Sequence, residues 1–320
     1  MRRLIPAAQL VAEARGRTAE LVPINVTPGR STTLLDRRTR AVTRLYDPAA
    51  RDAAEREADA VERAFAGGLP VPELIERFEF DGQIGLIMAP TIGAPLSLVE
   101  AGLGPAEHHA LMRQLGLMLA RLHGIEPGPP SDAVSVCTDM ADRARSMLRN
   151  ERTLANGVRS ALLSRIEALH TVAPTLRPYR PVLIHGAPDD RHVFVRRQRT
   201  RTIVSALVGF AASGAGDAMA DLAVVLFDGA RHHRSRIGVI EGYQKSHPID
   251  GQARTRLEIH LIARLATALQ RESHPAERTR LADVAMALIG EGTLARVVRP
   301  NPPRSEGLHR FRPREFGGHQ

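Results

Sequence analysis

The sequence pattern changes from strand-like to mostly helical near residue 93, and this change limits the folds that the chain can adopt. Before it, five runs rich in Val, Ile, Thr and Leu alternate with turns that contain Gly, Pro and Asp, as in an antiparallel sheet. These predicted strands are 21–26, 31–35, 41–46, 69–80 and 84–90. One helix is predicted at 48–66, with Pro48 near its start and Gly67-Gly68 at its end. The first 92 residues therefore predict a small β-rich lobe with the order β-β-β-α-β-β.

Residues 93–298 show a mostly helical pattern. In 105–124, the apolar residues recur at the spacing of one helix face. The other predicted helices are 139–172 with a break at Asn156-Gly157, then 217–229, 235–245, 254–271 and 276–290. A strand, a polar loop and a strand occupy 182–195, and a further strand is predicted at 202–210. The chain is therefore predicted to be α+β and bilobal, followed by a flexible basic tail at 299–320.

The amino-acid composition indicates which kinds of molecule the chain could bind and where in the cell it could be located. The net charge of +9 favours an anionic partner. Aromatic residues make up only 3% of the chain, which leaves few side chains for base stacking, so specific nucleic-acid binding is not expected. Cys137 is the only cysteine, which excludes an intrachain disulfide and fits the cytoplasm. The N-terminal apolar stretch is short and interrupted by charges, so no membrane span is expected.

Six segments, taken in order, resemble the aminoglycoside phosphotransferase and choline kinase-like family. They are AVTRLY (41–46), READAVERAFAGGLPVPELI (56–75), IGLIMAPTIGAPL (84–96), LGLMLARLHGI (115–125), LIHGAPDDRHVFV (183–195) and VGFAASGAGDAMADLA (208–223). The resemblance implies a bilobal protein-kinase-like fold, with an N-lobe at 1–92 and a helical C-lobe at 93–298. It also implies ATP and Mg²⁺ as cofactors.

The resemblance places a nucleotide site between the lobes. Arg44 stands where the family has a basic residue for the nucleotide phosphates, and Glu57 stands where its helical partner is expected. A structural salt bridge between the two is an equal alternative. Backbone groups of three residues would meet the adenine: Met88, Ala89 and Pro90. The turn at 28–31 has a single glycine, which does not favour a phosphate cradle of backbone N–H groups.

Three positions depart from the family's catalytic pattern. The family's catalytic loop reads His-Gly-Asp, four residues, then Asn, and its metal loop reads Ile-Asp-Phe. Here Ala187 replaces the catalytic Asp, His192 replaces the metal-binding Asn, and Gly209 replaces the metal-binding Asp. Ala and Gly carry no side-chain oxygen, and imidazole is a poor ligand for Mg²⁺. His192 is left as the one candidate metal ligand at these positions.

Residues that shape the loop are retained. The resemblance implies that His185, Asp217 and Asp221 brace it. Asp189 and Asp190 follow the altered position closely, and are either a relocated base or part of a polar turn. A base that moves along a loop loses most of its catalytic value, which favours the turn.

Two hypotheses follow for the function. The first is a pseudokinase that binds or scaffolds a protein or peptide partner, by analogy in a natural-product or modified-peptide pathway. The second is a divergent ATP-dependent kinase that phosphorylates a hydroxyl of a small molecule or peptide with Asp189 or Asp190.

Overall fold

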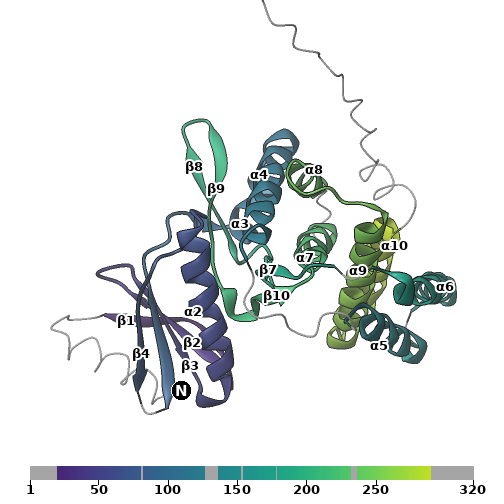
Figure 1. Cartoon of the computed structure of the whole chain (residues 1–320), viewed down its shortest axis with the longest axis horizontal. Helices are drawn as coiled ribbons and strands as arrows, with labels where there is room; N and C mark the ends of the chain where they lie inside the picture. Colours follow the sequence, from purple (N-terminus) through teal and green to yellow (C-terminus); the bar gives the residue numbers. More distant parts are fainter. Residues whose placement is uncertain are drawn as a thin grey trace, which may run out of the picture.

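The computed structural model describes residues 20–80, 82–126, 136–152, 154–177, 179–231 and 236–289. Within these ranges the chain forms a β-rich N-lobe and a larger helical C-lobe, as predicted (Figure 1). The tail predicted at 299–320 lies outside the described residues. None of the helices in the described part combines the length and the apolar character that a bilayer crossing requires.

The N-lobe is a five-stranded antiparallel sheet in the order β1-β2-β3-β5-β4. Its strands are β1 (Leu21–Thr27), β2 (Ser31–Asp36), β3 (Val42–Tyr46), β4 (Leu74–Phe80) and β5 (Gln83–Met88). The helix α2 (Arg51–Ala66) follows a short turn at Pro48–Ala50 and buries Ala54 and Ala58 against Tyr46, Ile84 and Leu86. The predicted order of elements is confirmed.

The predicted strand at 69–80 is too long, because β4 begins only at Leu74. The preceding segment contains Pro70 and Pro72, which have no N–H to donate to a sheet ladder. The strand predicted at 202–210 also ends early, at Leu207, because the chain turns at Gly209.

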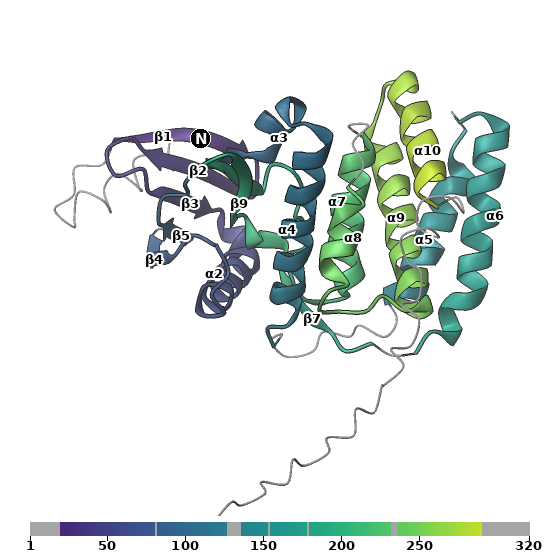
Figure 2. The ribbon, with the colours of Figure 1, turned by 90° about the horizontal axis from the view of Figure 1, so that it is seen from above.

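The C-lobe is built from eight helices within the described residues. They are α3 (Leu96–Val99), α4 (Pro105–His123), α5 (Val136–Asn150), α6 (Asn156–Val172), α7 (Ala218–Arg231), α8 (Gly238–Tyr243), α9 (Gly251–Arg271) and α10 (Pro275–Ile289). Figure 2 shows them stacked away from the N-lobe, from α4 through α7 and α9 to α6. The break predicted at Asn156-Gly157 lies slightly earlier, because α5 ends at Asn150 and Asn156 already begins α6. Asn and Gly are weak helix formers whose cost is small in a first turn.

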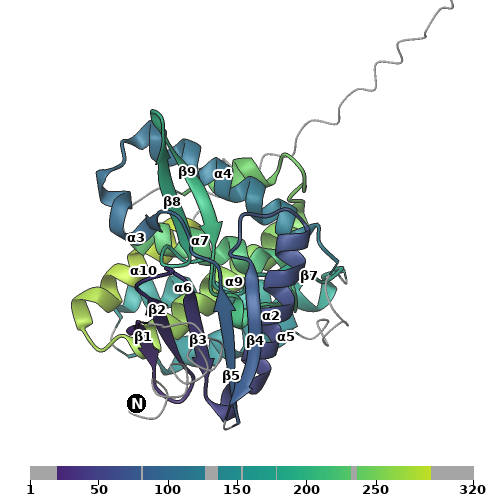
Figure 3. The same cartoon turned by 90° about the vertical axis from the view of Figure 1, so that its left-hand side faces the viewer.

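Short strands place the loop between the lobes. Strand β7 (Val182–Ile184) pairs with β10 (Gly214–Gly216), and β8 (Val193–Gln198) pairs with β9 (Arg201–Leu207) and β6 (Ala94–Pro95). The β8–β9 hairpin extends beyond the helices in Figure 3. The loop from His185 to His192 therefore joins two small sheets, as the predicted strand-loop-strand requires.

Helices α4 and α8 approach closely through a glycine. A Cβ atom at Gly116 would lie 2.0 Å from the carbonyl oxygen of Val239, so no larger residue fits while the helices keep this spacing. Gly157, in the first turn of α6, has open space around it.

We expect Gly116→Ala to lower the free energy of unfolding by about 1–3 kcal/mol, because the added methyl group must push the helices apart. The matched change Gly157→Ala should leave it unchanged or raise it by up to ~1 kcal/mol, since Ala is the better helix former. Urea denaturation of both variants checks this. Equal effects of the two substitutions would contradict the close packing.

Candidate functional site

Asp221, in the first turn of α7, holds the start of the loop from His185 to His192, the predicted catalytic loop. Its side chain is fully buried, and its two carboxylate oxygens each accept a backbone hydrogen bond, from the N–H of His185 and of Gly186, both at 2.8 Å. Nε2 of His123, at the end of α4, lies 3.1 Å from the same carboxylate. Burial alone would raise the pKa of Asp221, but the hydrogen bond and charge of His123 hold it below its ordinary value. The carboxylate thus connects α4, α7 and the loop.

His185 is a buried, neutral part of this frame. Its Nδ1 accepts a hydrogen bond from the N–H of Ala187 at 3.3 Å, which leaves Nε2–H to donate to the carbonyl of Val208 at 3.0 Å. Burial lowers the pKa of His185 to about 4. Its ring also packs on Phe210, with the centroids 4.3 Å apart. His185 therefore ties the catalytic loop to the segment that carries Gly209.

Asp217 supports the loop indirectly, through the first turn of α7. Its Oδ1 accepts a hydrogen bond from the N–H of Met219 at 3.1 Å, in the first turn of α7. Its Oδ2 accepts one from Nε of Arg256 at 3.0 Å and lies 3.2 Å from Nε2 of His260, both on α9. Asp217 therefore fixes the start of α7, and with it the position of Asp221.

The imidazole of His192 fills the space beside Gly209. Gly209 has a φ of +81°, in the left-handed region that favours glycine. A Cβ atom there would lie 2.4 Å from Cδ2 and 2.9 Å from Nε2 of His192. Any residue with a side chain at position 209 would therefore collide with His192 where it now lies. The two substitutions, His in place of Asn at 192 and Gly in place of Asp at 209, are thus sterically compatible with each other.

The carboxylate of Asp189 is held by its neighbours in the loop. Its Oδ1 accepts a hydrogen bond from the N–H of Arg191 at 3.0 Å, and its Oδ2 accepts one from the guanidinium at 2.6 Å. Nδ1 of His192 lies 2.8 Å from Oδ1, a contact that is an ion pair only when the imidazole is protonated. Burial would raise the pKa of Asp189, but His192 and Arg191 hold it well below its ordinary range. Such a carboxylate is a weak base.

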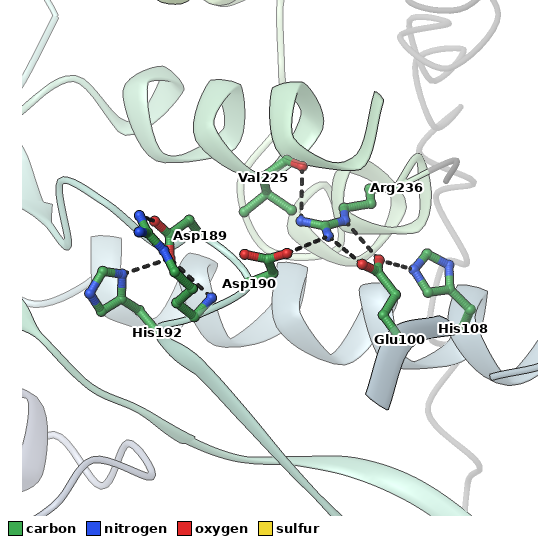
Figure 4. A network of polar contacts seen from close by, with 8 residues as sticks. Glu100, His108, Asp189, Asp190, His192, Val225 and Arg236 are labelled. Atoms are coloured by element: carbon green, nitrogen blue, oxygen red, sulfur yellow. Dashed lines mark hydrogen bonds and ion pairs between the residues drawn. The ribbon is translucent and has the colours of Figure 1, made fainter. Parts of the chain in front are cut away.

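Asp190 lies beside a buried ion pair that joins the segment after α3 to the one before α8 (Figure 4). Arg236 donates from Nε to Oε1 of Glu100 at 3.1 Å and from Nη2 to Oε2 at 2.8 Å. His108 lies 2.8 Å from Oε1, and Asp190 lies 4.0 Å from Nη2 of Arg236. Burial would raise the pKa of Glu100, but His108 and Arg236 lower it to about 2. Asp190 thus lies near the guanidinium group of Arg236, which already forms an ion pair with Glu100.

On the N-lobe side, Arg44 and Glu57 form the expected ion pair. Nη1 of Arg44 lies 3.1 Å and 3.0 Å from the two oxygens of Glu57, and its Nε donates to Oγ of Ser31 at 3.3 Å. The hydroxyl of Tyr46 donates to the same carboxylate. Burial and the charge of Glu57 raise the pKa of Tyr46. The pair is therefore structural in this state, and phosphate binding by Arg44 stays a prediction.

The segment expected to meet an adenine offers few backbone donors. Met88 is buried at the end of β5. The N–H of Ala89 donates to the carbonyl of Glu73 at 2.8 Å, and Pro90 has no N–H. Adenine recognition would therefore depend on carbonyl groups at Ala89 and Pro90.

The side chains around the loop do not fit Mg²⁺. In the described ranges, no three His, Cys, Asp or Glu side chains converge as metal ligands. Ala187 and Gly209 contribute no oxygen, and His192 supplies a nitrogen beside a carboxylate that Arg191 already holds. His192 is thus a packing residue in this structure rather than part of a ligand set.

Two features of the site were not predicted from the sequence. Arg191 clamps Asp189 from two positions away, which the adjacent letters Asp-Asp-Arg could have suggested. The pair between Glu100 and Arg236 joins residues 136 positions apart, and no local pattern marks it.

Comparison with known proteins places the fold. The chain belongs to the phosphotransferase enzyme family, whose sequence profile matches residues 29–260. The structure is similar to that of aminoglycoside 2'-phosphotransferase-IIIa in its GDP complex, with a TM-score of 0.66, 14% identity, and coverage of 90% of this chain and 99% of the other. No curated protein sequence matches the chain.

Two further structures are similar at the level of the fold. A mutant of aminoglycoside phosphotransferase APH(4)-Ia, in a ternary complex with ADP and hygromycin B, gives a TM-score of 0.62 at 15% identity and covers 88% of this chain and 97% of its own. APH(3'')-Id from Streptomyces rimosus gives 0.57 at 17% identity, with 82% and 98% covered. At these identities the likeness establishes the kinase-like fold alone.

We expect Arg236→Met to lower the free energy of unfolding by about 3–5 kcal/mol, because it leaves the buried carboxylate of Glu100 without its main counter-ion. Arg197→Met is the matched control. It breaks the exposed pair of Arg197 with Glu107 and should cost about 0–1 kcal/mol. Urea denaturation measures both, and a similar small cost for each would contradict the role of the buried pair.

We expect stability to fall as the pH drops from 6.5 towards 4, because the unfolded chain takes up a proton at His185 that the folded protein resists. With the pKa of folded His185 lowered to about 4, the free energy of unfolding should fall by about 3 kcal/mol over this pH range. Above pH 7 the histidine is neutral in both states and contributes no pH dependence. Urea midpoints between pH 7 and 4, compared for the wild type and His185→Gln, isolate the contribution. Identical pH profiles for the two proteins would contradict it.

Proposed function

We propose that this protein is a phosphotransferase-family pseudokinase that acts by binding. The packing of the His192 ring against Gly209 is the observation that most supports this function. The ring occupies the place of a metal-binding side chain, so the metal loop and the catalytic loop are adapted to each other without a metal ligand. Phosphoryl transfer depends on metal ions and positioned carboxylates to neutralise and orient the phosphates. A site built in this way retains the fold of the family and loses these groups.

A divergent active kinase is the second candidate. The observation that favours it is that Asp189 and Asp190 both line one cavity, where a substrate hydroxyl could reach them. Against it stand the low pKa of Asp189 and its hydrogen bonds with Arg191, since a general base works best with a pKa near the working pH.

Nucleotide binding by this chain is proposed to be weak and independent of Mg²⁺. Solved structures that are similar to this chain include complexes with GDP and with ADP, which supports a nucleotide as a ligand of the fold. Here Arg44 is already bound to Glu57 and Ser31, and the N–H of Ala89 is occupied.

The binding function that we propose is that of a scaffold for a protein or peptide partner in the cytoplasm. A role in a natural-product or modified-peptide pathway is an analogy with the family. The two hypotheses share a fold and differ in turnover, so a direct assay of turnover separates them.

We expect γ-labelled ATP with Mg²⁺ to lose its phosphate at the background rate in the wild type and in Asp189→Asn and Asp190→Asn alike. Asp142→Asn, an exposed carboxylate on α5, is the matched control. Release that requires Mg²⁺ and falls roughly 10²–10⁴-fold in Asp189→Asn or Asp190→Asn, but not in the control, would establish the active kinase instead.

A further inference from the structure

A cavity of about 930 Å³ lies on the C-lobe side of the catalytic loop. Loop residues 189–191 form one wall, and helices α5, α7, α9 and α10 form the others. Arg44 and Glu57 are not among the lining residues, so the cavity is separate from the predicted nucleotide site. Its volume is within the range of sites that hold a small organic molecule.

Arg264 on α9 lines this cavity, and one of its nitrogen atoms has no hydrogen-bond partner among the described residues. Its Nε is buried, and no acceptor for it lies within the described part of the chain. Burial lowers the pKa of Arg264, although Asp228 and Asp189 act in the opposite direction. Arg264 as a whole is only half-buried and contributes to the wall of the cavity. A guanidinium group in this position can donate hydrogen bonds to a carboxylate or phosphate group in the cavity.

The same face of α9 carries a second cation. Arg271 follows Arg264 by seven residues, two helical turns or about 10 Å further along, and also lines the cavity. Thr267 lies between them on this face. No ion pair of Arg264 or Arg271 forms within the ranges that the structure describes. Two guanidinium groups thus face one cavity from a single rigid helix.

The acidic residues of the cavity balance only part of its arginine charge. Asp189 is held by Arg191, and Asp190 lies beside Arg236. Oε1 of Glu272 accepts the N–H of His274, and Asp228 also faces the cavity, where burial raises its pKa. Neither carboxylate forms an ion pair with the described residues. The same holds for three arginines of the lining, Arg143 on α5 and Arg264 and Arg271 on α9, so positive charge is in excess.

We infer that this cavity binds a small anionic molecule, whose carboxylate or phosphate group is held by Arg264 and Arg271. Arg264 matches such a group with two parallel N–H donors. The apolar wall, formed by Met140, Met147, Phe227 and Leu281, accommodates the rest of the molecule. This inference deepens the proposed binding function and rests on it only in treating the ligand as bound and not turned over.

The experiment measures thermal unfolding of the full chain with citrate, inorganic phosphate or spermidine, each against NaCl of equal ionic strength. Citrate or phosphate should raise the Tm of the wild type in a concentration-dependent way, and spermidine should not. The arm that responds distinguishes a carboxylate from a phosphate ligand. In Arg264→Met and Arg271→Gln the anion should act only at concentrations at least tenfold higher. Arg254→Met, on the same helix but paired with Glu258, should respond like the wild type.

A second readout separates a ligand site from a structural role. Without added anion, Arg264→Met should keep or raise the Tm, because it removes a partly buried charge that forms no ion pair with the described residues. A clear fall in the Tm of Arg264→Met would overturn the inference, as would a larger response to spermidine than to the anions, or no response to either anion. None of these results bears on turnover of ATP, so the pseudokinase proposal stands or falls separately.

Discussion

The buried carboxylate of Asp221 is the contact on which the central part of the structure depends. It satisfies two backbone N–H groups of the catalytic loop and meets His123 from α4, so three elements share one charge. Asp217 fixes the first turn of α7, from which Asp221 projects, by its contacts with α9. Removal of Asp221 would leave buried N–H groups without an acceptor, which explains why such a residue belongs to the fold rather than to the chemistry.

Around these contacts of Asp221, we propose that the positions expected to carry phosphoryl transfer serve as packing. Ala187 contributes no carboxylate, and the ring of His192 occupies the space that a side chain at Gly209 would need. Asp189 survives as a carboxylate but is bound by Arg191. The supporting contacts and the reactive groups of this fold are therefore separable. In this chain the supporting contacts are present, and two arginines of α9 that form no ion pair with the described residues line the C-lobe cavity.

Much of the fold could be predicted because short, local sequence patterns indicate its strands, turns and helices. Alternating β-branched residues and turn residues define the N-lobe strands, and the motif letters place the catalytic and metal loops. Errors arose where one residue type overrides a pattern, as Pro70 and Pro72 do for β4. The site contacts could not be predicted in the same way. His192 meets Gly209, and Glu100 meets Arg236, only because the chain folds back on itself. The same is true of Nε of Arg264, whose lack of a hydrogen-bond partner among the described residues depends on how the helices around it pack.

The claim that His192 and Gly209 are adapted to each other is tested most directly by a double-mutant cycle of unfolding free energies. Gly209→Asp in the wild type should cost clearly more than the strain of its backbone alone, because its Cβ meets the imidazole and the ring must move. In the His192→Asn background, the same substitution should cost only about 1–2 kcal/mol, which is the residual penalty of a left-handed backbone for a residue with a Cβ. An equal cost of Gly209→Asp in both backgrounds would contradict the account.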